Sequence, residues 1–183
     1  MNPTNWQGAY EATAYLIALG HRRIGFVGGL AGPNSAAERL RGYRDALVAH
    51  DIPLESALIV DGGFTEQGGF DAAQKLLALP DLPGAIFASN DLSATGVIEA
   101  TRQRGLRVPQ DISVIGFDDI PQASLIYPKL TTVRQPLYQM GREAVALLLE
   151  QIEQPGGEKR QVMLETTLII RESCAPPRRP GGA

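Results

Sequence analysis

The sequence predicts an α/β fold, a parallel β-sheet flanked by helices. Four short apolar segments, at residues 24–27, 58–60, 85–88 and 112–117, alternate with segments of helical periodicity. This alternation is typical of a parallel sheet with right-handed crossovers. Each apolar segment also ends in a small or polar cluster. Because ligands of open α/β sheets bind beyond the carboxyl ends of the strands, these clusters predict a binding edge.

Five segments have helical periodicity, with apolar residues three or four positions apart: 8–19, 36–50, a stretch after Thr65, 93–105 and a stretch after Pro136. Asn5, Ser35 and Thr65 are candidate N-caps, because their side chains can accept a hydrogen bond from the first helical turn. Glu38 gives Ser35 the spacing of a capping box. A last strand is expected at residues 162–170.

Composition excludes several classes of protein. The net charge is −3, so the 183-residue chain has no basic footprint for nucleic acid. No apolar run approaches the roughly 18 residues of a membrane span. A single cysteine, Cys174, excludes an internal disulfide. The first twelve residues, MNPTNWQGAYEA, have no basic leader or apolar core, so we expect a cytoplasmic protein without a membrane partner.

The sequence has no pattern typical of an enzyme, a metal site or a cofactor site. The GGLAG segment at 28–32 lacks the GxGxxG spacing and a P-loop lysine. The two histidines, His21 and His50, both stand at expected helix ends, where capping roles are common. Asp118 and Asp119 are adjacent carboxylates at a strand end, where neighbouring side chains point apart. We therefore expect one to face a cleft and one to be structural, with no catalytic residue, metal or cofactor.

Four residues at the expected strand ends and loop ends are candidates for binding a small polar molecule. Arg39 has a planar set of donors suited to hydroxyl pairs or carboxylates, although a solvated surface arginine is the alternative. Phe64 can stack on a sugar or a base, or can be a core aromatic. Asn90 and Asp118 can accept or donate to ligand hydroxyls, or can cap the next helices. Together they predict a polar cleft with one aromatic wall.

Five segments, in this order, resemble the effector-binding core of the lac repressor/galactose repressor family: GHRRIGFVGG, SAAERLRGYRDAL, AIFASNDLSATGVIEA, VPQDISVIGFDDI and PKLTTVRQP. The resemblance covers about residues 8–172. It implies a type I periplasmic-binding-protein-like fold, in which two lobes hold a small molecule between them. It also implies a transcriptional regulator whose effector is a small polar molecule, with a sugar expected first and a purine as the alternative.

The resemblance also assigns roles to individual positions. Arg39 matches the family arginine that grips ligand hydroxyls, and Ser35 lies where a polar side chain often assists. Phe64 occupies the place of the aromatic residue that stacks on the ligand. Asn90 and Asp118 match two positions that accept and donate hydrogen bonds. The match is clearest at Asp118, because the GFDD motif around it is intact.

The resemblance implies a division of the chain. Residues 1–134 would form the distal ligand-binding lobe, and residues 135–163 a fragment of the DNA-proximal lobe. Residues 164–174 would return to the distal lobe, and 175–183 would be a disordered tail. The helix-turn-helix and most of the proximal lobe that precede this region in the family are absent from the sequence. We therefore expect DNA to be contacted only through an N-terminal domain that is missing here.

The resemblance further implies a homodimer, with the seam near residues 66–70, 94–99 and 122–127. The helix after Pro136 would lack its sheet, so non-native association of the fragment is also expected. The alternative function is a periplasmic sugar-binding protein of a transporter, which shares the fold. The GHRRI and PKLTTVRQP wording is characteristic of the regulators and favours the first function.

Overall fold

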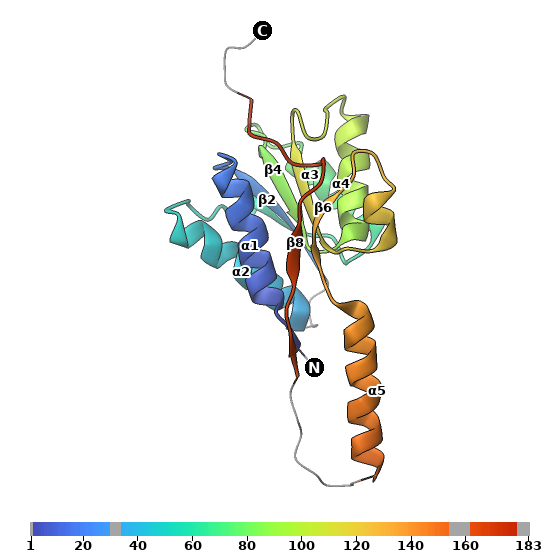
Figure 1. The fold of residues 1–183 in the computed structure, drawn as a ribbon. Helices are drawn as coiled ribbons and strands as arrows, with labels where there is room; N and C mark the ends of the chain where they lie inside the picture. Colours follow the sequence, from blue (N-terminus) through green and yellow to red (C-terminus); the bar gives the residue numbers. More distant parts are fainter. Residues whose placement is uncertain (1, 30–33, 154–161, 179–183) are drawn as a thin grey trace.

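The computed structural model describes residues 2–29, 34–153 and 162–178. Its main sheet has the strand order β3-β2-β4-β5-β6-β8 (Figure 1). The strands are β2 (Ile24–Gly28), β3 (Ile59–Asp61), β4 (Ala85–Ala88), β5 (Ser113–Asp118), β6 (Thr131–Arg134) and β8 (Thr167–Ile169). The first five pair in parallel and β8 pairs antiparallel with β6. The predicted fold class is therefore confirmed, with one antiparallel strand at the edge.

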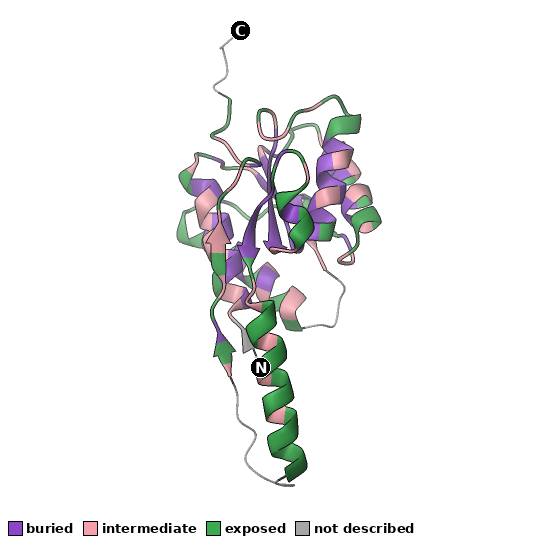
Figure 2. Cartoon of the chain, turned by 45° about the vertical axis from the view of Figure 1, so that its right-hand side comes forward, coloured by how far each residue is buried: buried purple, intermediate pink, exposed green. Residues whose placement is uncertain are grey.

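Helices cover both faces of this sheet. They are α1 (Asn5–Ala18), α2 (Asn34–Ala49), α3 (Glu66–Leu76) and α4 (Asp91–Gln103), with two short 3-10 turns, η1 (Ser56–Leu58) and η2 (Pro121–Ser124). One core cluster joins α1 and α2 to the sheet, and the other joins α3 and α4 to its opposite face. Buried residues therefore line both sides of the central strands (Figure 2).

The alternation of side chains along the strands divides the two clusters. Phe26, Phe87 and Phe117 point toward α1 and α2. Val27 and Ile86, each one position away from a phenylalanine, point toward α3 and α4. Successive residues of a strand face opposite sides, so a strand that is covered on both faces has an almost continuous apolar sequence. This explains why the central strands were predictable from short apolar runs.

Glycine allows each helix pair to approach closely. A side chain at Gly42 of α2 would collide with the backbone carbonyl of Trp6 in α1. A side chain at Gly96 of α4 would likewise collide with the backbone carbonyl of Glu66 in α3. The two pairs therefore pack backbone to backbone, and their close contact fixes the positions of the first turns of α2 and α4.

The expected single strand at 162–170 is wrong, because the chain there passes from one sheet to another. β7 (Met163–Leu164) pairs in parallel with β1 (Asn2–Pro3), while β8 pairs with β6. Between them, the Thr166 amide donates to Thr4 Oγ1 at 3.0 Å. This bond holds the crossing segment beside the start of α1 and separates the two ladders.

The fifth helix stands apart from the sheet (Figures 1 and 2). α5 (Leu137–Glu153) has no buried residue, and it carries several of the exposed apolar side chains of the described structure: Leu137, Tyr138, Val145, Leu148, Leu149 and Ile152. The division of the chain into two lobes remains a prediction. No described helix is both long and apolar enough to cross a bilayer.

The predicted helix caps have mixed outcomes. Thr65 caps α3 as expected, and its hydroxyl accepts from the Gly68 amide at 3.0 Å. Asn5 is the first residue of α1 and is not its N-cap, a position held by Thr4 without a side-chain cap bond. Ser35 is the second residue of α2 rather than the residue before it. The helix-end assignments from sequence were therefore displaced by one or two residues.

Residues 175–178 are held against the amino ends of β2 and β5, so the prediction of a disordered tail from residue 175 is wrong for this part. The Ala175 carbonyl accepts from His21 Nε2 at 2.9 Å and from Ser113 Oγ at 3.0 Å. Arg178 forms an ion pair with Asp111 at 3.1 Å. The proline and arginine content predicted disorder, whereas contacts with the side chains of His21, Ser113 and Asp111 hold the segment in place. Residues 179–183 lie outside the described residues.

We expect His21 to make the free energy of unfolding depend on pH. Burial lowers the pKa of this imidazole below 6.5, although the bond to the Ala175 carbonyl opposes the shift. The folded protein therefore binds fewer protons here than the unfolded chain. The stability from neutral His21 is present above pH 6.5 and decreases as the pH falls through that value toward the folded pKa.

Urea denaturation between about pH 7.5 and about pH 5.5 measures this effect. Relative to the wild type, His21→Gln should lose less stability as the pH falls across this window, because it lacks the loss caused by protonation of this histidine. His50→Gln is the matched control for removal of a histidine, because the His50 side chain bonds locally to the Ala46 carbonyl. Identical slopes for wild type and His21→Gln would contradict the assignment.

Candidate functional site

The carboxyl ends of β2, β4 and β5 carry the candidate site. The structure brings together four of the five predicted residues: Arg39, Phe64, Asn90 and Asp118. Ser35 lies one turn before Arg39 on α2 and is partly exposed. Its position on the same side of the helix suits a supporting role, but it makes no hydrogen bond to the other four in the described part of the chain.

Arg39 is a buried residue, only 4 % exposed, so the alternative of a solvated surface arginine is wrong. Its Nε donates to Asn5 Oδ1 at 2.9 Å, and its Nη1 donates to the Ser89 carbonyl at 2.5 Å. The guanidinium carbon lies 3.8 Å from the centroid of the Phe117 ring. Burial lowers the pKa of Arg39, and Asp118 opposes this shift. An arginine keeps its charge in such a setting.

Asp118 is the carboxylate partner of this cation. Its Oδ1 lies 3.3 Å from Arg39 Nη1 and accepts from Gln135 Nε2 at 2.6 Å. Burial raises the pKa of the Asp118 carboxyl, while Arg39 and Gln135 act in the opposite direction. The backbone φ of Asp118 is 115°, a strained value that is rare outside glycine. Strain of this kind is concentrated at functional sites.

The two adjacent carboxylates do point apart, as the sequence predicted. Asp119 accepts from Arg134 Nε at 2.6 Å and from Arg171 Nη2 at 2.6 Å. It therefore ties the end of β6 to the segment after β8 and is fully neutralised by two cations. Asp118 is contacted only through its Oδ1, by one nitrogen of the Arg39 guanidinium and by the Gln135 side-chain amide. Its Oδ2 has no partner among the described residues.

Asn90 and Phe64 are coupled through a hydrogen bond. Asn90 Oδ1 accepts from the Ser93 amide at 3.0 Å and caps α4, which was the structural alternative for this residue. Asn90 Nδ2 donates to the Phe64 carbonyl at 3.0 Å. Phe64 has a φ of 62°, is half-buried and belongs to neither core cluster. Its ring lies against Gly29, where a side chain would collide with it.

Two residues of the site were missed by the sequence reasoning. Asn5 was assigned to a helix cap, yet it orients Arg39 from α1. Gln135 had no assigned role, although it bonds to Asp118 from the end of β6. Gln135 directly follows β6, whose carboxyl end lies at the same edge of the sheet. No local pattern distinguishes Asn5.

The arrangement is suited to binding a small polar molecule. The described residues contain no group of three or more carboxylate, histidine or cysteine side chains that could hold a metal ion. Arg39 Nη2 and Asp118 Oδ2 are a donor and an acceptor that no described residue engages. They stand near Phe64, whose ring centroid is 5.9 Å from the Arg39 guanidinium carbon. A molecule with neighbouring polar groups and a flat face fits this set.

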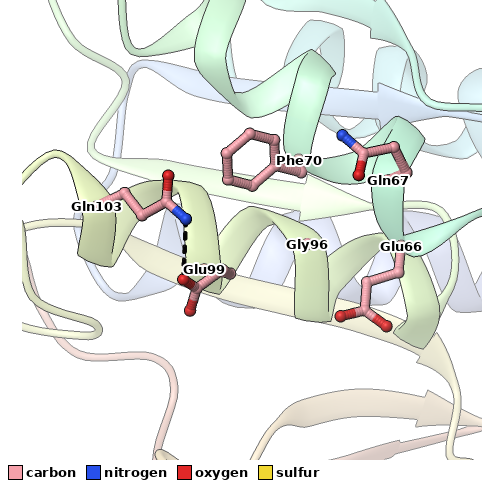
Figure 3. Close-up of a pocket in the computed structure, with 6 residues that line it drawn as sticks. All are labelled: Glu66, Gln67, Phe70, Gly96, Glu99 and Gln103. Carbon is pink, nitrogen blue, oxygen red and sulfur yellow. Dashed lines mark hydrogen bonds between the residues drawn. The ribbon is translucent and has the colours of Figure 1, made fainter.

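A second hollow of the surface lies between α3 and α4, away from these strand ends. It is a groove of about 420 Å³, and its lining residues are Glu66, Gln67, Phe70, Gly96, Glu99 and Gln103. Figure 3 shows the Phe70 ring over one side and the carboxylates of Glu66 and Glu99 along the other. This groove lies at segments 66–70 and 94–99, which the family resemblance implies for a dimer seam, and the seam stays a prediction.

Comparison with known proteins identifies the family. The model of the periplasmic binding protein-like domain matches residues 13–174. The ribose operon repressor of Escherichia coli K12 is 42 % identical over 167 residues, which are 91 % of this chain and 51 % of that protein. The repressor PurR of Photobacterium profundum is 38 % identical over 167 residues, 91 % of this chain and 50 % of that protein. The chain thus spans about half the length of these relatives.

Solved structures agree with this result. A CelR–cellobiose complex superposes with a TM-score of 0.89 at 39 % identity, covering 93 % of this chain and 52 % of that one. A LacI-family regulator of Enterococcus faecium with bound ribose has a TM-score of 0.89 at 32 % identity. The match covers 96 % of this chain and 65 % of that one. The chain belongs to the periplasmic-binding-protein-like domain family, in the form found in the effector-binding domains of LacI-family repressors.

Proposed function

We propose that this chain is the ligand-sensing domain of a LacI-type transcriptional regulator and that it binds a small polar effector, first of all a sugar. The observation that carries the proposal is the ion pair between the buried Arg39 and the half-buried Asp118, beside Phe64. The effector binds at the carboxyl edge of the sheet and controls operator binding by a helix-turn-helix outside this chain. DNA is contacted only through that segment.

The chemistry of a sugar matches the unengaged groups of the pair. One hydroxyl donates to Asp118 Oδ2 and a neighbouring oxygen accepts from Arg39 Nη2, so that both charged groups gain charge-assisted hydrogen bonds. The face of the sugar ring packs on Phe64. Bound ribose and cellobiose in two similar structures support this ligand class. A purine remains the second class, because it also stacks and forms paired hydrogen bonds.

In the complete regulator, the effector acts by shifting a population of conformations. It must bind one arrangement of the two lobes more tightly than the other, and the difference in affinity sets the change in operator binding. The proposal involves binding without a reaction, in line with relatives that are repressors. A periplasmic sugar-binding protein is the alternative, and the identity to repressors favours the regulator.

We expect effector binding to depend on Asp118. A screen of ribose, cellobiose, other common sugars and nucleobases should reveal a ligand that raises the melting temperature of the chain. At about a hundredfold excess over Kd, the stabilisation is about 2.7 kcal/mol. Asp118→Asn removes the charged acceptor and should weaken the interaction at least tenfold by calorimetry, which is about 1.4 kcal/mol.

The control is Asp71→Asn, which neutralises an exposed carboxylate on α3 that bonds only to Gln67 among the described residues. It should bind the same ligand with unchanged affinity. If folded Asp118→Asn binds as tightly as the wild type, the site lies elsewhere. If no member of the panel binds, neither sugars nor nucleobases are the effector of this chain.

Asn90 should contribute in two separable ways, to stability through the α4 cap and to effector binding through its bond to the Phe64 carbonyl. Asn90→Ala removes both the α4 cap and the bond to the Phe64 carbonyl, and should lower the free energy of unfolding by about 1 kcal/mol. Asn90→Asp keeps an acceptor for the Ser93 amide and loses only the donor to Phe64. It should therefore be less destabilised in urea, yet both variants should bind the effector more weakly. Equal destabilisation of the two variants would show that the cap contributes little.

We propose further that two copies associate through α3, α4 and η2. Leu125 and Tyr127 at the end of η2 are 80 % and 81 % exposed, and the groove containing Phe70 lies beside them. Exposed apolar patches of this kind mark interaction surfaces, and a two-fold dimer brings the same patch together from both copies. The α5 face is the competing surface, and association through it is non-native.

The two surfaces can be distinguished by light scattering over a range of protein concentrations. Tyr127→Glu places a charge in the first surface and should shift the chain toward monomer. Leu148→Glu makes the same kind of change on α5, an exposed apolar side chain replaced by glutamate, and should leave the dimer intact. The reverse result would show that the chain associates through α5, and a monomeric wild type would contradict both.

A further inference from the structure

Asp91 is a buried carboxyl directly behind the candidate site. It is the first residue of α4, follows Asn90 and is 1 % exposed. Its Oδ1 accepts from Thr132 Oγ1 at 2.5 Å, and its Oδ2 accepts from the Ile120 amide at 2.9 Å. One side chain therefore connects three elements: the start of α4, strand β6 and the turn that follows β5.

The surroundings are shaped to admit this carboxyl. A side chain at Gly116 of β5 would collide with Asp91 Oδ1 and with Leu130. The missing side chain thus makes the space that the carboxyl fills. Two hydrogen bonds and a fitted cavity fix the Asp91 oxygens far more tightly than a surface residue.

The turn held by Asp91 is the one that carries Asp118. Asp118 and Asp119 have φ values of 115° and 58°, so two consecutive residues occupy strained backbone conformations. Such conformations persist only when their surroundings hold them. On the near side, the Gln135 amide donates to the Asp118 carbonyl at 3.2 Å. On the far side, the bond from the Ile120 amide to Asp91 closes the turn.

We propose that Asp91 is a positioning residue, which holds the Asp118–Asp119 turn in the shape that directs Asp118 toward Arg39, and that the charge of Asp91 thereby changes effector affinity. The part concerning affinity rests on the proposed function. The part concerning the turn does not require an effector.

The charge of Asp91 changes near neutral pH. Burial raises the pKa of this carboxyl to about 7, with smaller contributions from Asp118 and Asp119, while the bonds from Thr132 and Ile120 act in the opposite direction. Arg39 on α2 is the cation that also interacts with it. Asp119 is neutralised by Arg134 and Arg171.

Ionisation should strengthen the hold on the turn and at the same time destabilise the fold. A charged carboxylate accepts more strongly from the Ile120 amide than a neutral acid does, so affinity rises with pH. The folded pKa lies above the ordinary value of 3.8, so the stability contributed by neutral Asp91 is complete below pH 3.8 and is lost as the pH rises through about 7. A merely structural residue would change affinity and stability in the same direction.

The first experiment needs no effector. In the ¹⁵N-labelled 183-residue chain, the NMR signal of the Ile120 amide proton should move downfield as the pH rises, with a midpoint near pH 7. Asp91→Asn should abolish this transition. The reference is the Gly63 amide, which donates to the exposed Asp61 carboxylate and should behave identically in both proteins. Should Asp91→Asn fail to fold, Thr132→Val removes one bond that favours the charged form and should move the midpoint above 7.

The second experiment measures affinity for D-ribose and for cellobiose by calorimetry at about pH 6 and about pH 8. The wild type should bind about fivefold more tightly at the higher pH. Asp91→Asn should bind equally at both. An Ile120 amide without the transition overturns the positioning role, and equal wild-type affinities with the transition present overturn the coupling to effector binding. Absence of any sugar binding, with the transition intact, contradicts the proposed function and leaves the positioning role standing.

Discussion

The burial of the Arg39 guanidinium is the constraint on which the candidate site depends. A buried cation is tolerated only when its charge is paired and its donors are bonded. Here Asp118 supplies the charge, Asn5 and Ser89 supply acceptors, and the Phe117 ring covers one face. These partners come from α1, from the residue after β4 and from β5, so the packing of the fold brings the Arg39–Asp118 pair together. Phe64, in contrast, stands in the turn after β3.

The hydrogen-bonding groups of Arg39 and Asp118 are only partly satisfied within the protein. Within the described residues, one donor nitrogen of Arg39 and one acceptor oxygen of Asp118 remain without a hydrogen-bond partner. Asp119, one position away, is bonded by Arg134 and Arg171 and has a structural role. Two chemically identical neighbours therefore have different environments because the strained backbone turns their side chains toward different partners.

The sequence predicted those features that are determined locally. The strand at Ala85–Ala88 was found at its observed bounds, because a strand covered on both faces is an uninterrupted apolar run. Features that depend on distant partners were missed. Asn5 lies 34 positions from Arg39, and the ordered segment after Ala175 depends on His21 at the other end of the chain. The two hydrogen bonds of Asn90 show why its capping and binding roles could not be separated from sequence.

The position of Gln135 connects the candidate site directly to the segment that leads from β6 to α5. Neither core cluster includes a residue of α5, so the sheet and its four packed helices hold Arg39 and Asp118 without it. The chain leaves this unit between β6 and α5, and Gln135 is the residue at that exit. Its side chain bonds to the same Asp118 that is offered to a ligand. Asp118 and the segment that leads to α5 are thus joined by one hydrogen bond, with no intervening residue of the core.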